Sequence, residues 1–445
     1  MKRRKFIQIS TVASACAVAP FNILKAGPSP NEKLNIAVIG VGNQGAGNAQ
    51  ALSKTDNIVA FCDVHESWHK RAINRYPDLQ NVKLWKDYRV MFDKIGKDID
   101  AVCVATPEHA HFAISMYAMR HGKHVYCQKP LCHNLEEIRL LTEESKKLKV
   151  ITQMGNQGHS SHSEANIRDW VQAGAIGNVR KVICYSEKNY WTYKPPVTGS
   201  KIPEDLDWNL FLNRAGELPF SDSYMDRNWI DFSHFSGTVG DMGGHILDPA
   251  FYSLELGAPV GVRADVEVLA KPWSMPPGSV ITWQFPARGK MPPVEMQLYL
   301  GNTWKNGPRP ERLDVGADES FMNSGSVMIG EKASIIAGSH GQNGRIIPEI
   351  KAKEIGEPSG NSYRVINGSH FENFSRACKG QEQIMSPFTY SGPLSEIISL
   401  GDIALKNPNR TLEWDAKNMK FTNDDEANKC LFLRRRDNRD NMNWY

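Results

Sequence analysis

The chain has no apolar run long enough to cross a bilayer, because no stretch of about 18 or more apolar residues occurs in its 445 positions. Its charge is nearly balanced, with 53 basic and 49 acidic residues, and this argues against a nucleic-acid partner. None of its 8 cysteines forms a C-x-x-C pair, and no Cys/His set has zinc-finger spacing. A permanent membrane span, nucleic-acid binding and a structural zinc site are therefore not expected.

The first 30 residues instead resemble an export signal. Arg3 and Arg4 in "KRRKFIQIS" precede a short apolar run, "TVASACAVAPF", which is typical of the twin-arginine route for folded proteins. We therefore expect a periplasmic protein. Cys16 follows "ASA", a weak match to a lipoprotein cleavage site, so lipid anchoring there is the less favoured alternative. The basic run 433–440 is interleaved with aspartates and is expected to be solvated.

A glycine-rich turn follows the first strand-like run. "LNIAVIG" (34–40) is short, apolar and β-branched, which predicts a strand. It leads into "GVGNQGAG", where Gly40, Gly42 and Gly45 stand in G-x-G-x-x-G register before a helix-like segment. The next strand-like run, "IVAFCD", ends in Asp63. The dinucleotide-binding fingerprint consists of a strand, a glycine turn, a helix and a second strand, with an acidic residue about 20 positions after the glycines. This stretch of the sequence has that arrangement.

The fingerprint predicts how a dinucleotide is held. Glycines let the backbone turn tightly and approach a pyrophosphate, whose charge is met by amides at the N-terminus of the helix. Asp63 is expected to accept hydrogen bonds from the ribose 2′-hydroxyl and to repel a 2′-phosphate, which favours NAD over NADP. A glycine turn with a solvent-facing Asp63 is the alternative. The expected contacts from this region are Gly40, Gly42, Asn43, Gln44, Gly45 and Asp63.

Strand-like and helix-like runs then alternate. Strands are expected at 98–107, 123–130 and 150–154, and helices at 109–122 and 135–149. Asn134 and Glu137 resemble a capping box at the start of the second helix. This rhythm predicts a doubly wound parallel sheet with ligands at the carboxyl ends of its strands. The residues expected at such ends are Thr106, Pro107, His109, His111, Gln128 and Lys129, with the two histidines towards the nicotinamide.

The pattern changes near residue 155. One more helix-like run, 164–174, is followed by longer strand-like runs at 179–191, 262–270, 279–285 and 294–300, between loops rich in proline and glycine. We expect an α/β protein: a signal segment at 1–30, a Rossmann domain with a doubly wound parallel sheet at 31–154, and an α+β domain with an open, mostly antiparallel sheet at 155–445.

Five motifs in the same order resemble the Gfo/Idh/MocA oxidoreductases. They are the dinucleotide fingerprint, "TPEHAHF" (106–112), "GKHVYCQKPL" (122–131), "GAIGNV" (174–179) and "GDMGGHILD" (240–248). "DLDWNLFL" (205–212) and "NDDEANK" (423–429) resemble the secreted bacterial branch. The resemblance implies NAD(P) binding, a sugar or cyclitol substrate, and assembly into dimers or tetramers through the open sheet.

The resemblance also implies a catalytic set. The lysine of the family's E-K-P motif falls on Lys129, and its D-x-x-x-H pair falls on Asp241 and His245. A histidine suits a general base at neutral pH. Asp241 is four residues before His245, so on a helix its carboxylate shares a face with the imidazole and is expected to orient it. Lys129 is expected to stabilise the developing alkoxide.

The chain departs from the family pattern at two places. Gln128 stands where the family has glutamate, so altered cofactor contact is expected, and the family's frequent arginine after the sixth strand is absent from "MGNQGHSS". His159 and His162 lie in that stretch; they could contact sugar hydroxyls or bind a metal, but a solvated loop is the preferred interpretation and no metal site is predicted.

The expected activity is NAD-dependent oxidation of a hydroxyl on a sugar, glycoside or cyclitol, with tightly bound NAD recycled in place. Free NAD is not maintained in the periplasm, so the cofactor is expected to be loaded before export. Two alternatives remain open. One is redox-neutral glycoside cleavage through a transient keto-sugar, and the other is a non-catalytic, NAD-stabilised sugar-binding protein.

Overall fold

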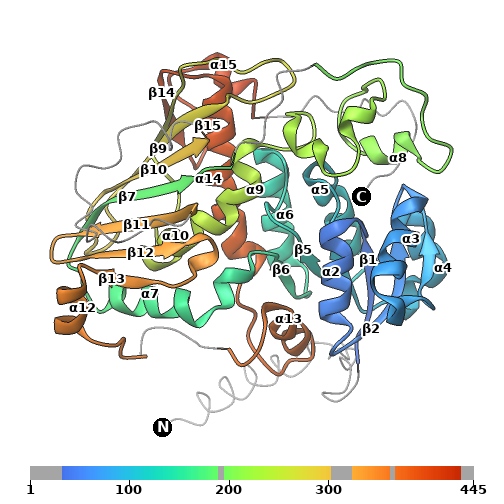
Figure 1. The fold of residues 1–445 in the computed structure, drawn as a ribbon, viewed down its shortest axis with the longest axis horizontal. Helices are drawn as coiled ribbons and strands as arrows, with labels where there is room; N and C mark the ends of the chain where they lie inside the picture. Colours follow the sequence, from blue (N-terminus) through green and yellow to red (C-terminus); the bar gives the residue numbers. More distant parts are fainter. Residues whose placement is uncertain (1–32, 189–194, 302–322, 361–365, 432–445) are drawn as a thin grey trace, which may run out of the picture.

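The computed structural model describes residues 33–188, 195–301, 323–360 and 366–431 (Figure 1). The expected signal segment with Cys16, and the basic run 433–440, lie outside the described residues. Within those ranges no helix combines the length and the hydropathy that a membrane span needs.

The N-terminal half contains a six-stranded, all-parallel sheet. Its strands stand in the order β3-β2-β1-β4-β5-β6, which is the strand order of a dinucleotide-binding Rossmann fold. The strands are β1 (Asn35–Ile39), β2 (Asn57–Cys62), β3 (Lys83–Trp85), β4 (Ala101–Val104), β5 (His124–Cys127) and β6 (Thr152–Met154). The predicted doubly wound sheet is confirmed, although the strands are shorter than the apolar runs suggested.

Both faces of this sheet are covered. Side chains alternate along β1, so Ile36 and Val38 join the core beneath α2, while Ala37 and Ile39 join the larger core on the other face. The helices of this half are α2 (Asn43–Leu52), α3 (Glu66–Arg75), α4 (Tyr88–Ile95), α5 (Glu108–Arg120) and α6 (Leu135–Lys147). The elements β3, α3 and α4 were not predicted, because "KLW" is mostly exposed, α3 is strongly polar and α4 has only 8 residues.

The predicted capping box forms only in part. The Asn134 side chain accepts a hydrogen bond from the Glu137 backbone N–H at 3.0 Å, so it caps α6 as expected. The Glu137 carboxylate is bonded to Arg214 at 2.9 Å and does not return to the Asn134 backbone. A charged partner from a distant segment therefore replaces the second half of the box.

The C-terminal half contains a nine-stranded mixed sheet. Its order is β13-β12-β11-β7-β10-β9-β8-β14-β15, in which β7 and β10 are parallel and the other pairs are antiparallel. The strands are β7 (Val179–Ser186), β8 (Gly261–Asp265), β9 (Gly278–Phe285), β10 (Val294–Gly301), β11 (Ser324–Gly330), β12 (Ser334–Gly338), β13 (Arg345–Ile347), β14 (Thr411–Asp415) and β15 (Lys420–Phe421). The predicted mostly antiparallel sheet is confirmed.

Helices pack on one face of the second sheet and fill the space between the two halves (Figure 1). The buried helix α14 (Phe388–Lys406) lies against both β9 and α6, and the Trp283 indole donates a hydrogen bond to its Ile397 carbonyl at 3.0 Å. The other described α-helices of this half are α7 (His162–Gln172), α8 (Trp208–Leu212), α9 (Thr238–Ile246), α10 (Asp248–Ser253), α12 (Glu349–Ile355), α13 (His370–Cys378) and α15 (Asp425–Asn428).

The chain returns to the first sheet near its end. The expected domain boundary at residue 155 falls directly after β6, but α13 packs against α2. Phe374 is fully buried there, in the same cluster as Val38 and Tyr126 of the first sheet. By packing, α13 belongs to the N-terminal half although it lies more than 200 residues away from it in sequence.

Candidate active site

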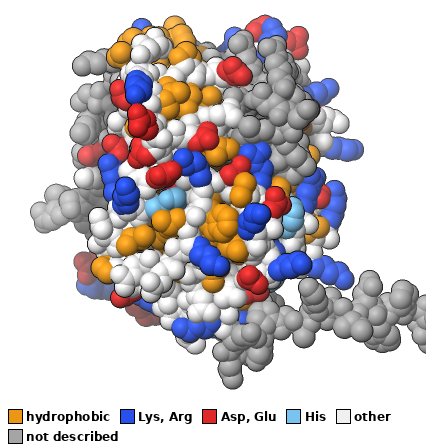
Figure 2. Space-filling view, turned by 90° about the vertical axis from the view of Figure 1, so that its right-hand side faces the viewer, with side chains coloured by type: hydrophobic (Ala, Val, Ile, Leu, Met, Phe, Trp, Pro, Cys, Tyr) orange, Lys and Arg blue, Asp and Glu red, His pale blue; other side chains and the backbone are white. Residues whose placement is uncertain are grey.

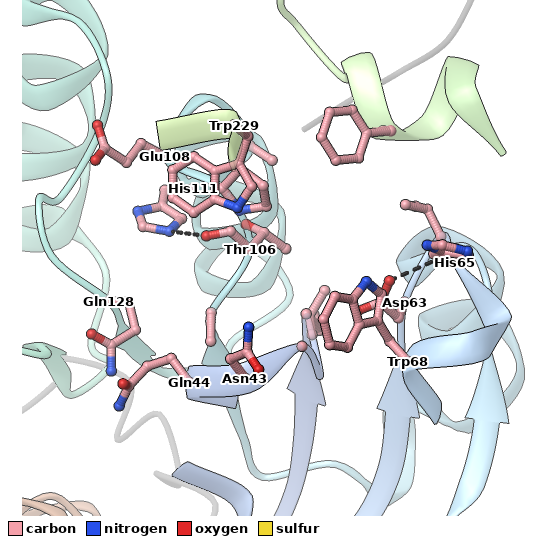
Figure 3. A pocket seen from close by; sticks show the side chains of 18 of the residues that line it. Asn43, Gln44, Asp63, His65, Trp68, Thr106, Glu108, His111, Gln128 and Trp229 are labelled. Carbon is pink, nitrogen blue, oxygen red and sulfur yellow. Dashed lines mark hydrogen bonds between the residues drawn. The ribbon is translucent and has the colours of Figure 1, made fainter. Parts of the chain in front are cut away.

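A cavity of about 500 Å³ lies at the carboxyl ends of the parallel strands, where the two halves meet. One side of it is built by the glycine turn, the end of β2 and the start of α5 (Figure 3). The other side is built by α9 and by an aromatic segment that contributes Phe211, Tyr224 and Trp229. The cavity therefore draws residues from both halves of the chain.

The glycine turn leaves space where the fingerprint predicts a pyrophosphate. Gly40 has a positive φ of 83°, and a Cβ on it would lie 2.6 Å from the Thr106 backbone N. A Cβ on Gly45 would lie 1.8 Å from the Gly40 oxygen, so this glycine permits close packing of α2 on β1. A Cβ on Gly42 would meet only Trp68, at 3.5 Å, and would project into the cavity rather than into backbone.

Asp63 is held rigidly at the end of β2. Its Oδ2 accepts a hydrogen bond from the Val41 N–H at 2.8 Å, and its Oδ1 accepts one from the His65 N–H at 3.0 Å (Figure 3). Burial raises the pKa of Asp63, and the two backbone donors oppose that rise. The carboxylate thus lines the cavity beside Trp68 in a fixed orientation, ready to accept from a ribose hydroxyl.

Unpartnered buried polar atoms at the cavity fit a bound dinucleotide. The Gln128 Nε2 and Thr106 Oγ1 atoms are buried and have no hydrogen-bond partner in the part of the chain that the structure describes. Both residues line the cavity. Such groups are costly unless a ligand satisfies them. Together with the glycine turn, they match the needs of the cofactor that the fingerprint predicts.

Lys129 is anchored to the opposite half by Asp241. The Lys129 ammonium donates hydrogen bonds to the Asp241 backbone oxygen at 2.5 Å and to its Oδ1 at 3.1 Å. Two further cations lie near the same carboxylate, since Lys188 is 3.8 Å from Oδ2 and Arg227 is 3.7 Å from Oδ1. Asp241 therefore fixes the Lys129 ammonium in the cavity.

His245 lies one turn further along α9. Burial lowers its pKa well below the ordinary value, and the nearby Lys129 ammonium lowers it further, so the imidazole is neutral at physiological pH. Its Nδ1 is buried and has no hydrogen-bond partner among the described residues. The predicted carboxylate–imidazole contact with Asp241 is thus not made through Nδ1. The ring stacks on His340, with centroids 3.7 Å apart.

Close approach of α9 to Lys129 depends on a glycine. A Cβ on Gly244 would lie 3.3 Å from the Lys129 Cβ, which is tighter than most real contacts. Gly240 is similarly constrained, since a Cβ there would lie 2.8 Å from the Glu108 Oε1. Small residues in "GDMGGH" therefore let the helix carrying His245 pack against the strand ends of the other half.

Most of the residues selected from the sequence line this one cavity. They are Gly40, Gly42, Asn43, Gln44, Asp63, Thr106, Pro107, His111, Gln128, Lys129, Asp241 and His245. Gly45 and His109 do not line it. The His109 Nε2 lies 2.7 Å from the Phe211 oxygen, and its ring packs on Phe235, which favours a role in local structure.

His111 is not directed at a ligand by its ring nitrogens. Its Nδ1 lies 2.9 Å from the Pro130 oxygen and its Nε2 lies 2.9 Å from the Thr106 oxygen. These contacts tie the ends of β4 and β5 together, and Figure 3 shows the one to Thr106. The residue therefore positions the segment that carries Lys129.

The preferred interpretation of His159 was wrong. The loop "GHSSH" was expected to be solvated, but His159 is only 3% exposed and faces Glu164 and Asp248. Its burial depends on partners up to 89 residues away, which no local pattern reveals. His162, by contrast, is exposed.

Several cavity residues were not selected from the sequence. His340 comes from a short turn, Ser339–Gly341, after β12, and has a left-handed φ of 65°. Trp229 and Arg227 come from the irregular aromatic segment, and Glu108 from the first turn of α5. Of these residues, only Glu108 stands in a motif that the sequence analysis recognised, "TPEHAHF" (106–112). The others occur in turns with no periodicity to mark them.

Sequence profiles of one family match the chain in two consecutive blocks. The NAD-binding Rossmann domain of the oxidoreductase family Gfo/Idh/MocA matches residues 34–156, and its C-terminal α/β domain matches residues 163–283. The two matches follow each other in the order seen in the fold. The chain belongs to the Gfo/Idh/MocA family of oxidoreductases, and its N-terminal domain is an NAD-binding Rossmann domain.

Curated relatives match part of the chain. Myo-inositol 2-dehydrogenase of Thermotoga maritima is 30% identical over 146 residues, 32% of this chain and 42% of that protein. D-glucoside 3-dehydrogenase of Escherichia coli is 25% identical over 235 residues, 52% of this chain and 57% of that protein. The chain thus spans about half the length of the curated relatives it matches.

Solved structures share the fold over most of the chain. An inositol dehydrogenase homologue from Azotobacter vinelandii, complexed with NADH and myo-inositol, matches with a TM-score of 0.56 at 15% identity, covering 87% of this chain and 100% of that one. An aldose–aldose oxidoreductase from Caulobacter crescentus matches with a TM-score of 0.53 at 16% identity, covering 86% and 100%. At these identities the likeness shows the fold alone.

Proposed function

We propose that this protein is an NAD-dependent oxidoreductase acting on a hydroxyl of a sugar, glycoside or cyclitol. One observation carries the proposal: Lys129 from the Rossmann half and His245 from the other half line the cavity that contains the dinucleotide-binding turn. The names of the relatives, which include an inositol dehydrogenase and a glucoside dehydrogenase, support a polyhydroxylated substrate.

His245 is the proton acceptor in this proposal. NAD, when bound, supplies the acceptor for the hydride that leaves the carbinol carbon. As that C–H bond breaks, the hydroxyl proton passes to an imidazole nitrogen of His245 and the C=O bond forms. The lowered pKa of His245 keeps the imidazole unprotonated and able to accept.

Lys129 stabilises the charge that develops on the substrate oxygen. Its side chain is only 16% exposed, and its ammonium is held by the Asp241 backbone oxygen and carboxylate, so it need not reorganise during the reaction. Asp241 balances the cationic charge of Lys129 before substrate arrives. This role differs from the orienting role expected from the sequence.

A second candidate is redox-neutral glycoside cleavage through a transient keto-sugar. The observation that favours it is His340, a second imidazole in the same cavity, whose pKa is lowered by burial and by Lys129. In cleavage a base removes the proton from the carbon next to the carbonyl, the glycosidic C–O bond at the following carbon breaks so that the aglycone leaves by elimination, and water adds at that carbon; His340 is a candidate base for the proton removal. Hydride then returns to the substrate, so no net oxidation occurs.

The experiment is to purify the full chain, determine any bound nucleotide by absorbance and mass spectrometry, and add a panel of glycosides, free sugars and inositols. Reduction of bound cofactor that a ketone acceptor reverses supports the oxidoreductase. Release of an aglycone without added NAD supports cleavage. Saturable binding without either reaction would reject both and leave a sugar-binding protein.

Tight retention of NAD and a periplasmic location complete the proposal. A cofactor trapped with an exported enzyme must be recycled in place, either by a second substrate or by a redox-neutral reaction. The arginine pair at positions 3 and 4 supports export of the folded, loaded protein. We also propose a homo-oligomer, because the family's open sheet is its assembly face; a monomeric mass by light scattering would reject this.

A further inference from the structure

A second cluster of ionisable side chains lies outside the cavity. His159 follows β6, Glu164 lies in the first turn of α7, and Asp248 begins α10. All three are buried, with exposed fractions of 3%, 1% and 1%. None of them lines the cavity, so the proposed reaction leaves them without a role.

Their ligating atoms converge on one point. The His159 Nδ1 lies 3.2 Å from the Glu164 Oε1 and 3.2 Å from each carboxylate oxygen of Asp248. One N–H cannot be donated to three oxygens at once, and charge-assisted hydrogen bonds are usually shorter, at about 2.7–2.9 Å. The three residues therefore surround a common centre rather than form one directed hydrogen bond.

The cluster has more acceptors than donors. The Glu164 Oε2 is buried without a hydrogen-bond partner among the described residues, and so is the Asn156 Oδ1 beside it in the cluster. The Asn156 Nδ2 donates to Asp248 at 2.6 Å, and the Tyr390 hydroxyl donates to the other Asp248 oxygen. A buried site with surplus oxygen acceptors is what a cation requires.

We propose that His159, Glu164 and Asp248 bind a divalent transition-metal ion, Zn²⁺ or Mn²⁺. One imidazole nitrogen and two carboxylates form a ligand set that both ions accept. Two carboxylates and a neutral imidazole balance the charge of a divalent ion. Asn156 and Tyr390 then act as outer partners that orient the Asp248 carboxylate, as buried metal sites commonly require.

An ion triad without metal fits the site less well. A protonated His159 compensates one of the two buried carboxylates and leaves the other as a buried charge, which costs several kcal/mol. A divalent ion between the three side chains compensates both carboxylates.

The cluster also supports the cavity from behind. Asp248 comes three residues after His245, and a Cβ on Gly341 would lie 2.9 Å from the Glu164 Oε2. Gly341 belongs to the turn that carries His340. A bound ion therefore cross-links α7, α10 and the segment after β6 beside the two histidines of the cavity, and its role is structural.

The test measures the metal directly. The full chain is treated with a chelator, desalted, incubated with ZnCl₂ or MnCl₂ separately, desalted again and analysed for metal per chain. We expect about one equivalent of one of these ions, and an unfolding temperature that rises with the concentration of that ion. Glu164→Gln and Asp248→Asn should each weaken metal binding by at least about tenfold.

Glu349→Gln is the matched control, because it removes an exposed carboxylate that pairs with Lys353 across one helical turn. It should bind metal like the unaltered protein. Circular dichroism checks that each variant is folded. Wild-type protein that retains neither ion, or Glu164→Gln that retains it undiminished, would overturn the proposal. The metal content of the wild-type protein tests the proposal even if a variant does not fold. Lys129→Ala, which changes the cavity and not the cluster, should bind metal normally.

Discussion

The imidazole rings of His245 and His340 lie stacked, with centroids 3.7 Å apart and planes 23° from parallel. They come from elements nearly 100 residues apart in sequence, and both line the cavity. Burial and the Lys129 ammonium lower the pKa of both rings, and His340 lowers the pKa of His245 further. Two neutral imidazoles in contact provide two proton acceptors. Once one ring has accepted a proton, its charge disfavours protonation of the other ring.

Replacing the proton acceptor should slow hydride transfer without removing the cofactor. We expect His245→Ala to lower the single-turnover rate by about 10²-fold or more, which is the usual contribution of general base catalysis. Reduction of bound nicotinamide, followed at its near-ultraviolet absorbance band, isolates this step from product release. Near-normal reduction would move the proton acceptor to another residue, with His340 the first candidate.

Lys129→Ala should slow the same step by about 10²-fold or more, because the cation beside the developing alkoxide is lost. Bound cofactor should remain, since the glycine turn supplies most of its contacts. Asp241→Asn should have a milder effect, because the Asp241 backbone oxygen still accepts from Lys129. If Lys129→Ala loses bound cofactor instead, the lysine is a cofactor contact and not a catalytic residue.

Asp63→Ser should relax the preference for NAD over NADP. The substitution removes the charge that repels a 2′-phosphate, and it also removes acceptors for the Val41 and His65 amides, so some stability is lost. The measurement is the ratio of the two dissociation constants. Glu66→Gln, an exposed neighbour paired with Lys86 at 2.8 Å, is the control for nonspecific charge. An unchanged ratio in Asp63→Ser would argue against the assigned contact.

Three glycine substitutions in one turn should separate folding from binding. Gly45→Ala places a Cβ 1.8 Å from the Gly40 oxygen and should destabilise the protein by at least about 1–3 kcal/mol. Gly42→Ala meets only Trp68 at 3.5 Å, so it should fold but bind NAD more weakly. Gly47→Ala, whose nearest neighbour is 4.0 Å away, should do neither. Equal NAD affinity in Gly42→Ala and Gly47→Ala would contradict the placement of the pyrophosphate.

Glu108 should make stability fall as the pH rises. Burial raises the pKa of Glu108 to about 8, from 4.5, and its Ser236 and Gly237 hydrogen bonds only partly oppose this. Between those two values the folded state holds a proton that the unfolded state has lost. Stability contributed by the protonated group is therefore present below pH 4.5 and is lost progressively up to pH 8.

Glu108→Gln stays neutral throughout, so its free energy of unfolding relative to wild type should increase with pH across that window. The slope should approach about 1.4 kcal/mol per pH unit at most. Urea unfolding at several pH values measures the difference in the free energy of unfolding between Glu108→Gln and wild type. The contributions of the other ionisable groups cancel, because both proteins contain them. A difference that does not change with pH would show that Glu108 is ionised in the folded protein.

Replacing Arg3 and Arg4 with lysine should leave the precursor in the cytoplasm, because the twin-arginine route discriminates between these cations. Fractionation of cells expressing the full chain measures this. A matched control replaces Lys2 and Lys5 with arginine, which keeps the arginine pair and the charge. Undiminished export of the double lysine variant would reject the signal assignment.

The sequence was most informative where periodicity and motif coincide. Alternating runs and the glycine fingerprint were enough to predict the parallel sheet, and Lys129, Asp241 and His245 could be placed from motifs alone. The sequence was enough to predict that the second sheet is mostly antiparallel, but not to predict the order of its strands. That order depends on pairings such as β7 with β11, which begin about 145 residues apart and leave no local trace.

Residues that depend on distant partners could not be predicted. His340 lies in a polar turn that resembles any surface loop, and only the packing of α9 beside it brings its ring to His245. His159 was misjudged for the same reason, because Glu164 and Asp248 bury it. The contact between the Asp241 carboxylate and Lys129 could not be predicted, because helical spacing relates Asp241 to His245 on the same helix but cannot reveal Lys129 in the other half.

The packing of α13 on α2 has a consequence for biosynthesis. Phe374 and Cys378 complete the core beneath the glycine turn, and they are synthesised more than 300 residues after it. The nucleotide-binding half therefore cannot reach its final packing while the ribosome is still translating the middle of the chain. Completion of this half waits until nearly the whole polypeptide has emerged, so a truncated translation product ending before α13 would carry an incompletely packed Rossmann core.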